Sequence, residues 1–153
     1  MKEAKLILDR EDFSRSKSGH VHGRLFVQFE ELQFPDASWN DFIVVVLGWW
    51  CRACCRLLAG EEESLEVPFM DGPYRVHLGP HSGQLIHLEL IEDRSSRRVW
   101  CQAEVSIGVL FDSVVAAAES AVLECQTRGW SSRDADELAD ALKSLHRARL
   151  RTG

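Results

Sequence analysis

The chain has 153 residues, 45% of them apolar and 27% charged, and its net charge is −6. This length is typical of one domain and the apolar content is too high for a disordered chain, so we expect a single folded domain over residues 1–153. The acidic excess repels nucleic acid and anionic membrane surfaces, so neither is an expected partner, and a basic protein fits the charge better.

Five cysteines form an odd set, and three of them lie within residues 51–55. Disulfide frameworks of exported domains usually have an even set of dispersed cysteines, so we expect reduced thiols and a cytoplasmic location. Residues 1–10 mix charged and apolar side chains and do not resemble a secretory signal. Residues 42–59 are apolar, but Arg52 and Arg56 interrupt them, which favours a core helix over a membrane span.

Two short strands are expected near the beginning of the chain. Residues 5–8 are mostly apolar, and residues 24–29 alternate in period two, with Leu25, Val27 and Phe29 on one face. A polar loop at residues 14–19 separates the two segments, so we expect them to pair as an N-terminal hairpin.

Residues 39–59 are predicted to form a helix. Ser38, followed three residues later by Asp41, resembles a capping box, and Gly60 stands where a helix C-cap belongs. The β-branched residues 43–46 alone would favour a strand, so the prediction depends on length and periodicity. The apolar residues at helical spacing are Phe42, Ile43, Val46, Leu47, Trp50, Cys54, Leu57 and Leu58.

Four further strands are expected, linked by short turns, and therefore arranged as an antiparallel meander. An Asp-Gly turn at residues 71–72 joins the first two strands. Pro68 cannot donate a ladder hydrogen bond, so its strand should lie at a sheet edge or carry a bulge. The predicted strands are residues 65–70, 74–78, 85–91 and 99–105.

Two helices should close the chain. The first is expected over residues 107–128, ended by Gly129, and the second begins near Ser131 or Ser132 with Leu138, Leu142 and Leu145 on one face. The predicted fold class is α+β: an antiparallel sheet of five or six strands, one central helix after the N-terminal strands, and two C-terminal helices packed on the sheet.

Several residue patterns were weighed as chemical sites. The Cys51-x-x-Cys54 pair lies about three turns inside its helix, where no helix N-terminus lowers a thiol pKa, so buried structural thiols are favoured over a redox or zinc site. His77 and His87 fall on the polar faces of adjacent strands and are weak candidates for a metal site. No phosphate-binding loop, nucleophile elbow or metalloprotease motif is present, so no catalytic residue and no cofactor is predicted.

Trp49 does not belong to the apolar stripe that contains Trp50. With Val45 and Arg52 it lines another side of the helix, which is either covered by a second layer or exposed as a Trp and Arg patch of the kind that binding hot spots favour. The candidate partner-binding residues are Trp49, Glu61, Glu62, Glu63, Asp71 and Tyr74.

The middle third of the chain carries a recognisable pattern. It contains Phe34-Pro35, Trp39, Asp41-Phe42, Val46-Leu47 and Trp49-Trp50, followed by Phe69-Met70-Asp71-Gly72-Pro73-Tyr74. This pattern resembles small bacterial proteins whose general build is similar to that of immunity proteins of polymorphic toxin systems. The resemblance implies a non-enzymatic protein-binding module, of the kind whose acidic surface neutralises a basic toxin, and implies no catalytic residues.

Two alternatives stay open at this point. The first is a small-ligand-binding protein or an enzyme of unknown reaction, with a pocket between sheet and helices that uses His77 and His87 or carboxylates. The second is a structural homodimer that associates through the Trp49 face.

Overall fold

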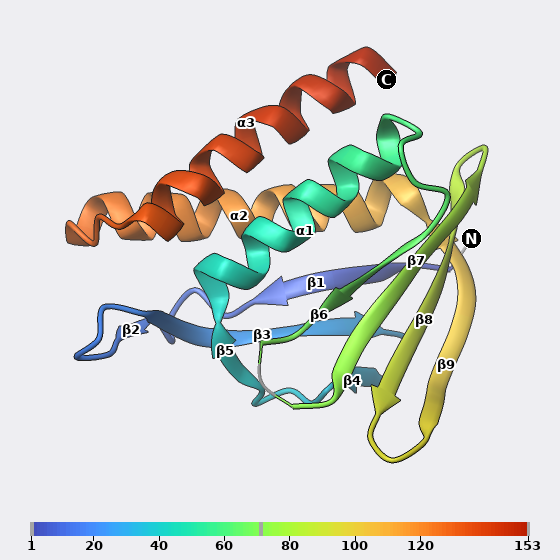
Figure 1. The fold of residues 1–153 in the computed structure, drawn as a ribbon, viewed down its shortest axis with the longest axis horizontal. Helices are drawn as coiled ribbons and strands as arrows, with labels where there is room; N and C mark the ends of the chain where they lie inside the picture. The colour runs from blue at the N-terminus through green and yellow to red at the C-terminus, as the bar shows by residue number, and fades with distance from the viewer. Residues whose placement is uncertain (1, 71, 153) are drawn as a thin grey trace.

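The computed structural model describes residues 2–70 and 72–152 and has the α+β class that the sequence predicts, with a helix after the N-terminal strands and two helices at the end (Figure 1). The strands are β1 (Ala4–Leu8), β2 (Ser14–Arg15), β3 (Val21–Phe29), β4 (Leu32–Phe34), β5 (Asn40–Phe42), β6 (Leu65–Pro68), β7 (Tyr74–Ser82), β8 (Leu85–Asp93) and β9 (Arg97–Ser106). The helices are α1 (Ile43–Leu58), α2 (Ile107–Arg128) and α3 (Arg133–Thr152).

The N-terminal strands form a sheet centred on β3. Strand β1 pairs antiparallel with β3, with Leu6 opposite Val27, which confirms the predicted hairpin. The short strands β2, β4 and β5 also pair with β3. Side chains of β3 alternate between buried and partly buried along its whole length, as the period-two pattern indicates.

The later strands form the antiparallel meander that the sequence predicts, in the order β6-β7-β8-β9. Strand β6 is at one end of this order, so Pro68 lies in an edge strand, as expected from its missing N–H group. At the other end, Lys2 forms a parallel bridge with Val105, and Ser106 N donates to Lys2 O at 2.9 Å. The strands of the described residues therefore divide between two sheets that meet where β9 ends.

Helix α1 is the central element of the fold. It contacts α2, α3, β3 and β6, and its stripe from Ile43 to Leu57 is buried. Figure 1 shows α1 between the sheets and α3, with α2 behind it. The β-branched residues 43–46 are helical because Ile43, Val44 and Val46 are buried, and this burial outweighs their strand propensity.

The start of α1 corrects the sequence prediction. The helix begins at Ile43 rather than at residue 39, and residues 40–42 form β5 instead. The proposed capping box is wrong: Phe42 is the N-cap and has no side-chain capping bond, while Ser38 bonds Asp36. In residues 2–70 and 72–152, no helix combines the length and apolar character needed to cross a membrane.

The two C-terminal helices cover α1 and the N-terminal sheet. Helix α2 begins at Ser106, whose hydroxyl accepts from Val109 N at 3.2 Å, and ends at Gly129 with a left-handed φ of 67°. It contacts β1, whereas α3 packs on α1 and α2. The predicted apolar face of α3 is buried in this interface, including Leu138 and Leu145.

Candidate functional site

A surface groove of about 310 Å³ lies between α1 and the edge strand β6. The helix and the strand are joined by residues 59–64, so this loop closes one end of the groove. The helix wall is formed by Trp49, Arg52, Ala53 and Arg56, and the strand wall by Leu65, Glu66, Val67 and Pro68.

Trp49 is partly buried in this groove and lies outside the fully buried stripe that contains Trp50. The lining residues of α1 are spaced at i, i+3, i+4 and i+7 from Trp49, so they share one face of the helix. The sequence left open whether the side of the helix that carries Trp49 is covered or exposed. In the structure β6 covers part of this side, and the indole still lines an accessible surface.

Two arginines follow Trp49 along the helix wall, one and two turns further on. Arg52 Nη2 lies 3.6 Å from Glu137 Oε2, and Arg56 Nη2 donates to Glu62 Oε1 at 2.5 Å. Their side chains keep 47% and 51% of their surface exposed. Exposed ion pairs of this kind contribute little to stability, so both guanidinium groups remain accessible to a further anionic group.

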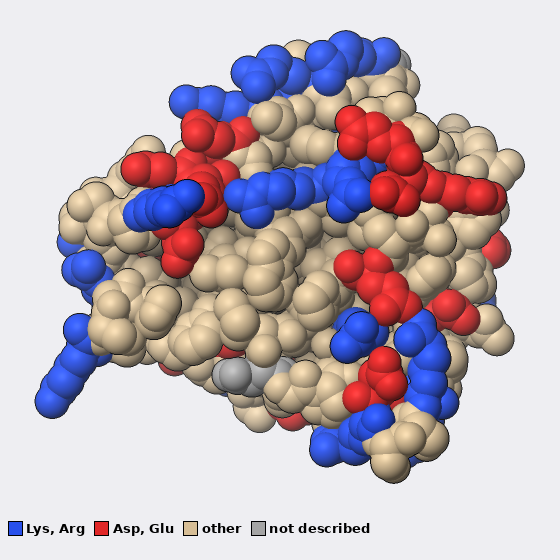
Figure 2. Space-filling model, in the orientation of Figure 1, with Lys and Arg blue, Asp and Glu red and all other residues tan. Residues whose placement is uncertain are grey.

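The acidic loop, residues Glu61–Glu63, adjoins these arginines. Glu61 N donates to Arg56 O at 3.1 Å, and the loop passes so close to β7 that a Cβ on Gly79 would lie 2.4 Å from Glu63 O. Glu61 and Glu63 are exposed, whereas Glu62 is partly buried. Figure 2 shows acidic side chains gathered beside the arginines near the C-terminal end of α1. The acidic loop therefore lies beside Arg56, at the opposite end of the helix wall from Trp49.

The other predicted contact residues lie elsewhere. Asp71 is outside the described residues. Tyr74 belongs to an aromatic cluster beyond the end of β6, in which it makes edge-to-face contacts with Phe34, Trp39 and Trp100. Arg94 lies over the Tyr74 ring, with 5.8 Å from its Cζ atom to the ring centroid.

Asp41 is a buried structural carboxylate, a role that the sequence interpretation as part of a capping box missed. Only 1% of it is exposed, and its carboxylate accepts from Trp39 Nε1 at 3.0 Å, from Met70 N at 3.1 Å and from Phe42 N at 2.7 Å. It therefore ties β5 to the turn that follows β6. Aromatic residues from the two separated parts of the sequence pattern form one cluster beside this link: Phe34, Trp39, Phe69 and Tyr74.

The cysteines of α1 are buried thiols, as predicted. Cys51 and Cys54 have no exposed surface and are not in disulfides. Burial raises the pKa of the Cys51 thiol to about 12 and holds the pKa of Cys54 well above its ordinary value. Both thiols therefore stay protonated near neutral pH and are poor nucleophiles.

The two candidate histidines each face a carboxylate on the exposed side of the meander. His77 Nδ1 lies 3.6 Å from Glu66 Oε2, and His87 Nδ1 lies 2.9 Å from Glu104 Oε1. Over the part of the chain that the structure describes, His, Cys, Asp and Glu side chains form no group of three or more that could hold a metal ion. His77 and His87 thus each lie beside a different carboxylate, Glu66 and Glu104 respectively.

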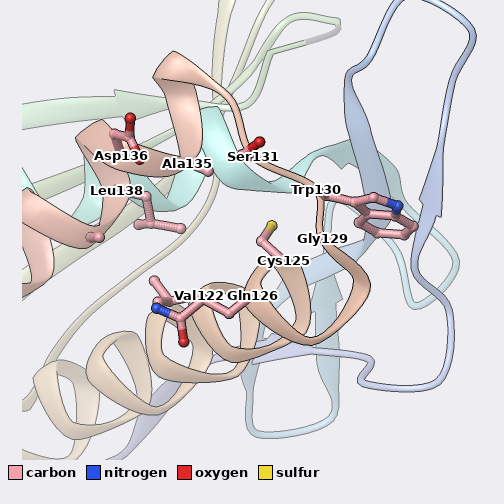
Figure 3. Close-up of a pocket in the computed structure, with 10 residues that line it drawn as sticks. Val122, Cys125, Gln126, Gly129, Trp130, Ser131, Ala135, Asp136 and Leu138 are labelled. Atoms are coloured by element: carbon pink, nitrogen blue, oxygen red, sulfur yellow. The ribbon is translucent and has the colours of Figure 1, made fainter.

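A smaller cavity of about 220 Å³ lies where α2 turns into α3. Figure 3 shows the Cys125 sulfur and the Leu138 side chain between the two helices, with Trp130 turned outward toward the N-terminal strands. Burial raises the pKa of the Cys125 thiol. The lining is mainly apolar, so this cavity suits a small apolar group better than a charged one.

Comparisons with protein-family models, with curated proteins and with solved structures found no match.

Proposed function

We propose that this protein is a non-enzymatic protein-binding module that acts as an immunity protein, neutralising a toxin by docking it on the groove between α1 and β6. The observation that carries the proposal is the partly buried Trp49, which lines the groove on the same helix face as the exposed Arg52 and Arg56. Tryptophan and arginine are the side chains most enriched at the energetic centres of protein interfaces.

The local structure supports a preformed docking surface. The acidic loop is held by the Arg56–Glu62 ion pair and by its close approach to Gly79, and the helix wall belongs to the central helix of the fold. A surface that is already ordered loses less conformational entropy on association, which favours tight binding.

Charge supports a basic partner. The net charge is −6, and Glu61 and Glu63 project from the loop without an ion pair among the described residues. An acidic protein that presents exposed carboxylates beside an aromatic anchor accelerates encounter with a basic partner. The resemblance of the pattern in residues 34–74 to small bacterial proteins similar to immunity proteins agrees with this proposal.

The proposal is tested with the protein encoded beside this one in its genome. Expressed alone, that protein should arrest growth, and co-expression with the wild-type chain should restore growth and yield a complex of nanomolar affinity. Trp49→Ala should weaken the complex by about 2 kcal/mol or more, the usual effect at an interface hot spot.

Trp130→Ala is the matched control, because it removes a second partly buried tryptophan at the remote turn between α2 and α3. It should leave the affinity unchanged. Failure of the neighbour-encoded protein to bind, or equal loss of affinity in the two variants, would contradict the proposal. A stable dimer of this chain that buries Trp49 would support the homodimer alternative instead.

A second candidate function is the binding of a small apolar ligand, and the cavity between α2 and α3 favours it. A ligand that occupies this cavity should raise the melting temperature of the protein in proportion to its affinity. Ala139→Phe would fill the cavity and should abolish that rise. If no small aromatic or aliphatic probe raises the melting temperature, this candidate fails.

A further inference from the structure

The outer edge of β6 carries backbone groups that no neighbouring strand uses. Phe69 N donates to Tyr74 O at 3.1 Å, so this residue pair is hydrogen-bonded across β6 and β7. Antiparallel ladders alternate bonded and non-bonded pairs, and Val67 lies opposite Val76 in the next bonded pair. Pro68 lies between these two pairs, and Glu66 lies between the Val67 pair and the pair of Leu65 with Leu78. Both residues therefore direct their backbone groups away from β7, toward the free edge.

The outward backbone groups of Glu66 and Pro68 lie at the free edge of β6, which borders the groove. Among the described residues, β6 pairs with β7 alone, and no hydrogen bond reaches Glu66 N or Glu66 O from outside the sheet. Pro68 has no N–H group, so its outward position costs the β6–β7 ladder nothing. The free edge offers one donor, the Glu66 N–H group, and two acceptors, the carbonyls of Glu66 and Pro68.

The two arginines of the helix wall are separated by nearly the same distance as alternate residues of a strand. Arg52 and Arg56 are one helical turn apart, about 6 Å along the axis of α1. Alternate residues of an extended chain are separated by about 6.8 Å. In a strand lying in the groove, three alternate side chains on one face would therefore lie beside the helix wall. The first would lie beside Trp49, and the next two beside Arg52 and Arg56.

We propose that the groove binds an extended segment of the partner protein, which adds to the free edge of β6 as a further strand. The segment carries an apolar side chain against Trp49 and acidic side chains, at alternate positions, facing Arg52 and Arg56. This inference rests on the proposed function and specifies how the partner docks. Pairing at a sheet edge is a general mode of peptide recognition, in which the backbone supplies affinity and alternate side chains supply specificity.

Charge complementarity supports an acidic face on this segment. Both arginines are about half exposed and each has a single ion pair among the described residues, with Glu137 and Glu62. A guanidinium group has five N–H donors, so each has donors left for a second carboxylate. The acidic segment is a local requirement and is compatible with a partner that is basic overall and meets Glu61 and Glu63 outside the groove.

Pro68 also sets the length of the added strand. Because Pro68 offers no N–H donor, the hydrogen bonds between β6 and the added strand centre on Glu66. The added strand is therefore short. Such a limited edge is open to a short recognition segment and resists open-ended sheet association between copies of the chain.

The test uses a synthetic heptapeptide, acetyl-Thr-Leu-Thr-Asp-Thr-Glu-Thr-amide, titrated into isotopically labelled protein and followed by NMR. We expect saturable shifts of the Glu66 amide and the Trp49 indole, with a dissociation constant on the order of 1 mM or tighter. This peptide requires no toxin, so its result is independent of whether the neighbour-encoded protein binds. Absence of saturable shifts in the wild-type protein overturns the inference.

Two variants separate the backbone from the side chain of Glu66. Glu66→Pro removes the outward N–H group without removing a ladder bond, and Glu66→Ala removes the same carboxylate but keeps the N–H group. Glu66→Pro should bind the peptide at least tenfold more weakly than Glu66→Ala, once both spectra show a folded protein. Equal affinities would overturn the proposed strand addition.

A charge exchange provides a test that does not depend on the stability of Glu66→Pro. The double variant Arg52→Glu/Arg56→Glu changes only exposed side chains. It should lose affinity for the acidic peptide and gain affinity for the peptide in which Asp and Glu are both replaced by Lys. Unchanged preference for the acidic peptide would overturn the proposed pairing with the arginines.

Discussion

Asp41 is a buried carboxylate whose hydrogen bonds connect residues far apart in the chain. Its Oδ2 atom accepts from both Trp39 Nε1 and Met70 N, and these two donors lie on opposite sides of α1 in the sequence. A buried acceptor with several N–H donors stabilises the fold most when it is charged and fully bonded. Asp41 therefore fixes the Pro68 end of β6, which is one end of the groove.

We expect Asp41→Asn to lower the free energy of unfolding by about 2–3 kcal/mol, because the amide replaces an acceptor with a donor that faces other N–H groups. Urea denaturation measures this loss. Asp36→Asn is the matched control: Asp36 is exposed, its carboxylate accepts from the neighbouring Ser38, and its replacement should cost well below ~1 kcal/mol. Similar losses in the two variants would contradict the role given to Asp41.

Gly79 holds the acidic loop in place because it lacks a Cβ atom. Its φ is +99°, and an added Cβ would lie 2.4 Å from Glu63 O. Gly79→Ala should therefore destabilise the protein by roughly 3 kcal/mol, since backbone strain and a steric clash add together. Gly83→Ala is the control: φ there is +61° with no atom within 4 Å, so only the backbone cost of about 1 kcal/mol applies. Equal melting temperatures for the two variants would contradict the close approach.

Helix α1 shows how far periodicity alone predicts an element. The spacing of apolar residues correctly identified the helix, most of its buried residues and the position of Trp49 outside them, although the predicted Phe42 and Leu58 are only partly buried. Its start was misplaced because the Ser38 and Asp41 pattern is local, whereas Asp41 is used by Met70, 29 residues further on. Strands β2, β4 and β5 have two or three residues each, too few to show an alternating pattern.

The groove could be predicted only in part for the same reason. Trp49 and the acidic residues 61–63 were recognised from composition and helical phase. The opposite wall was not, because placing β6 beside α1 depends on contacts between distant residues. Tyr74 was a candidate partner-binding residue, but its ring packs against Phe34 and Trp100, which come from strands in both sheets.

The thiols of α1 predict how stability depends on alkaline pH. The pKa of Cys51 is raised to about 12 in the folded protein, so the unfolded chain releases this proton first. The stabilisation is complete below the unfolded pKa and is lost as pH rises toward 12. Between pH 9 and 10 the free energy of unfolding should fall by about 1 kcal/mol from this thiol.

Denaturation at the two pH values measures this slope. Cys51→Ala should show a shallower decrease than the wild type, whereas Cys101→Ala, which removes a partly exposed thiol, should retain most of it. A wild-type slope that Cys51→Ala leaves unchanged would contradict the burial of this thiol.

The whole molecule combines an acidic surface with a groove formed by the central helix and a sheet edge. We expect the acidic charge to speed the approach of a basic partner and the groove to slow its release. The first effect changes the association rate constant, and the second changes the dissociation rate constant. Glu61→Gln/Glu63→Gln should lower the association rate constant severalfold and reduce its dependence on salt. Trp49→Ala should instead raise the dissociation rate constant. Surface plasmon resonance resolves both, and the reverse assignment of effects would contradict the division of roles.

Hydrogen–deuterium exchange on the complex with the neighbour-encoded protein locates the docking surface directly. We expect new protection in residues 49–56 and 64–68, with the Glu66 amide among the most protected positions, and little change at the turn between α2 and α3. A stable complex in which these two segments exchange as fast as in the free protein would contradict docking in the groove between α1 and β6.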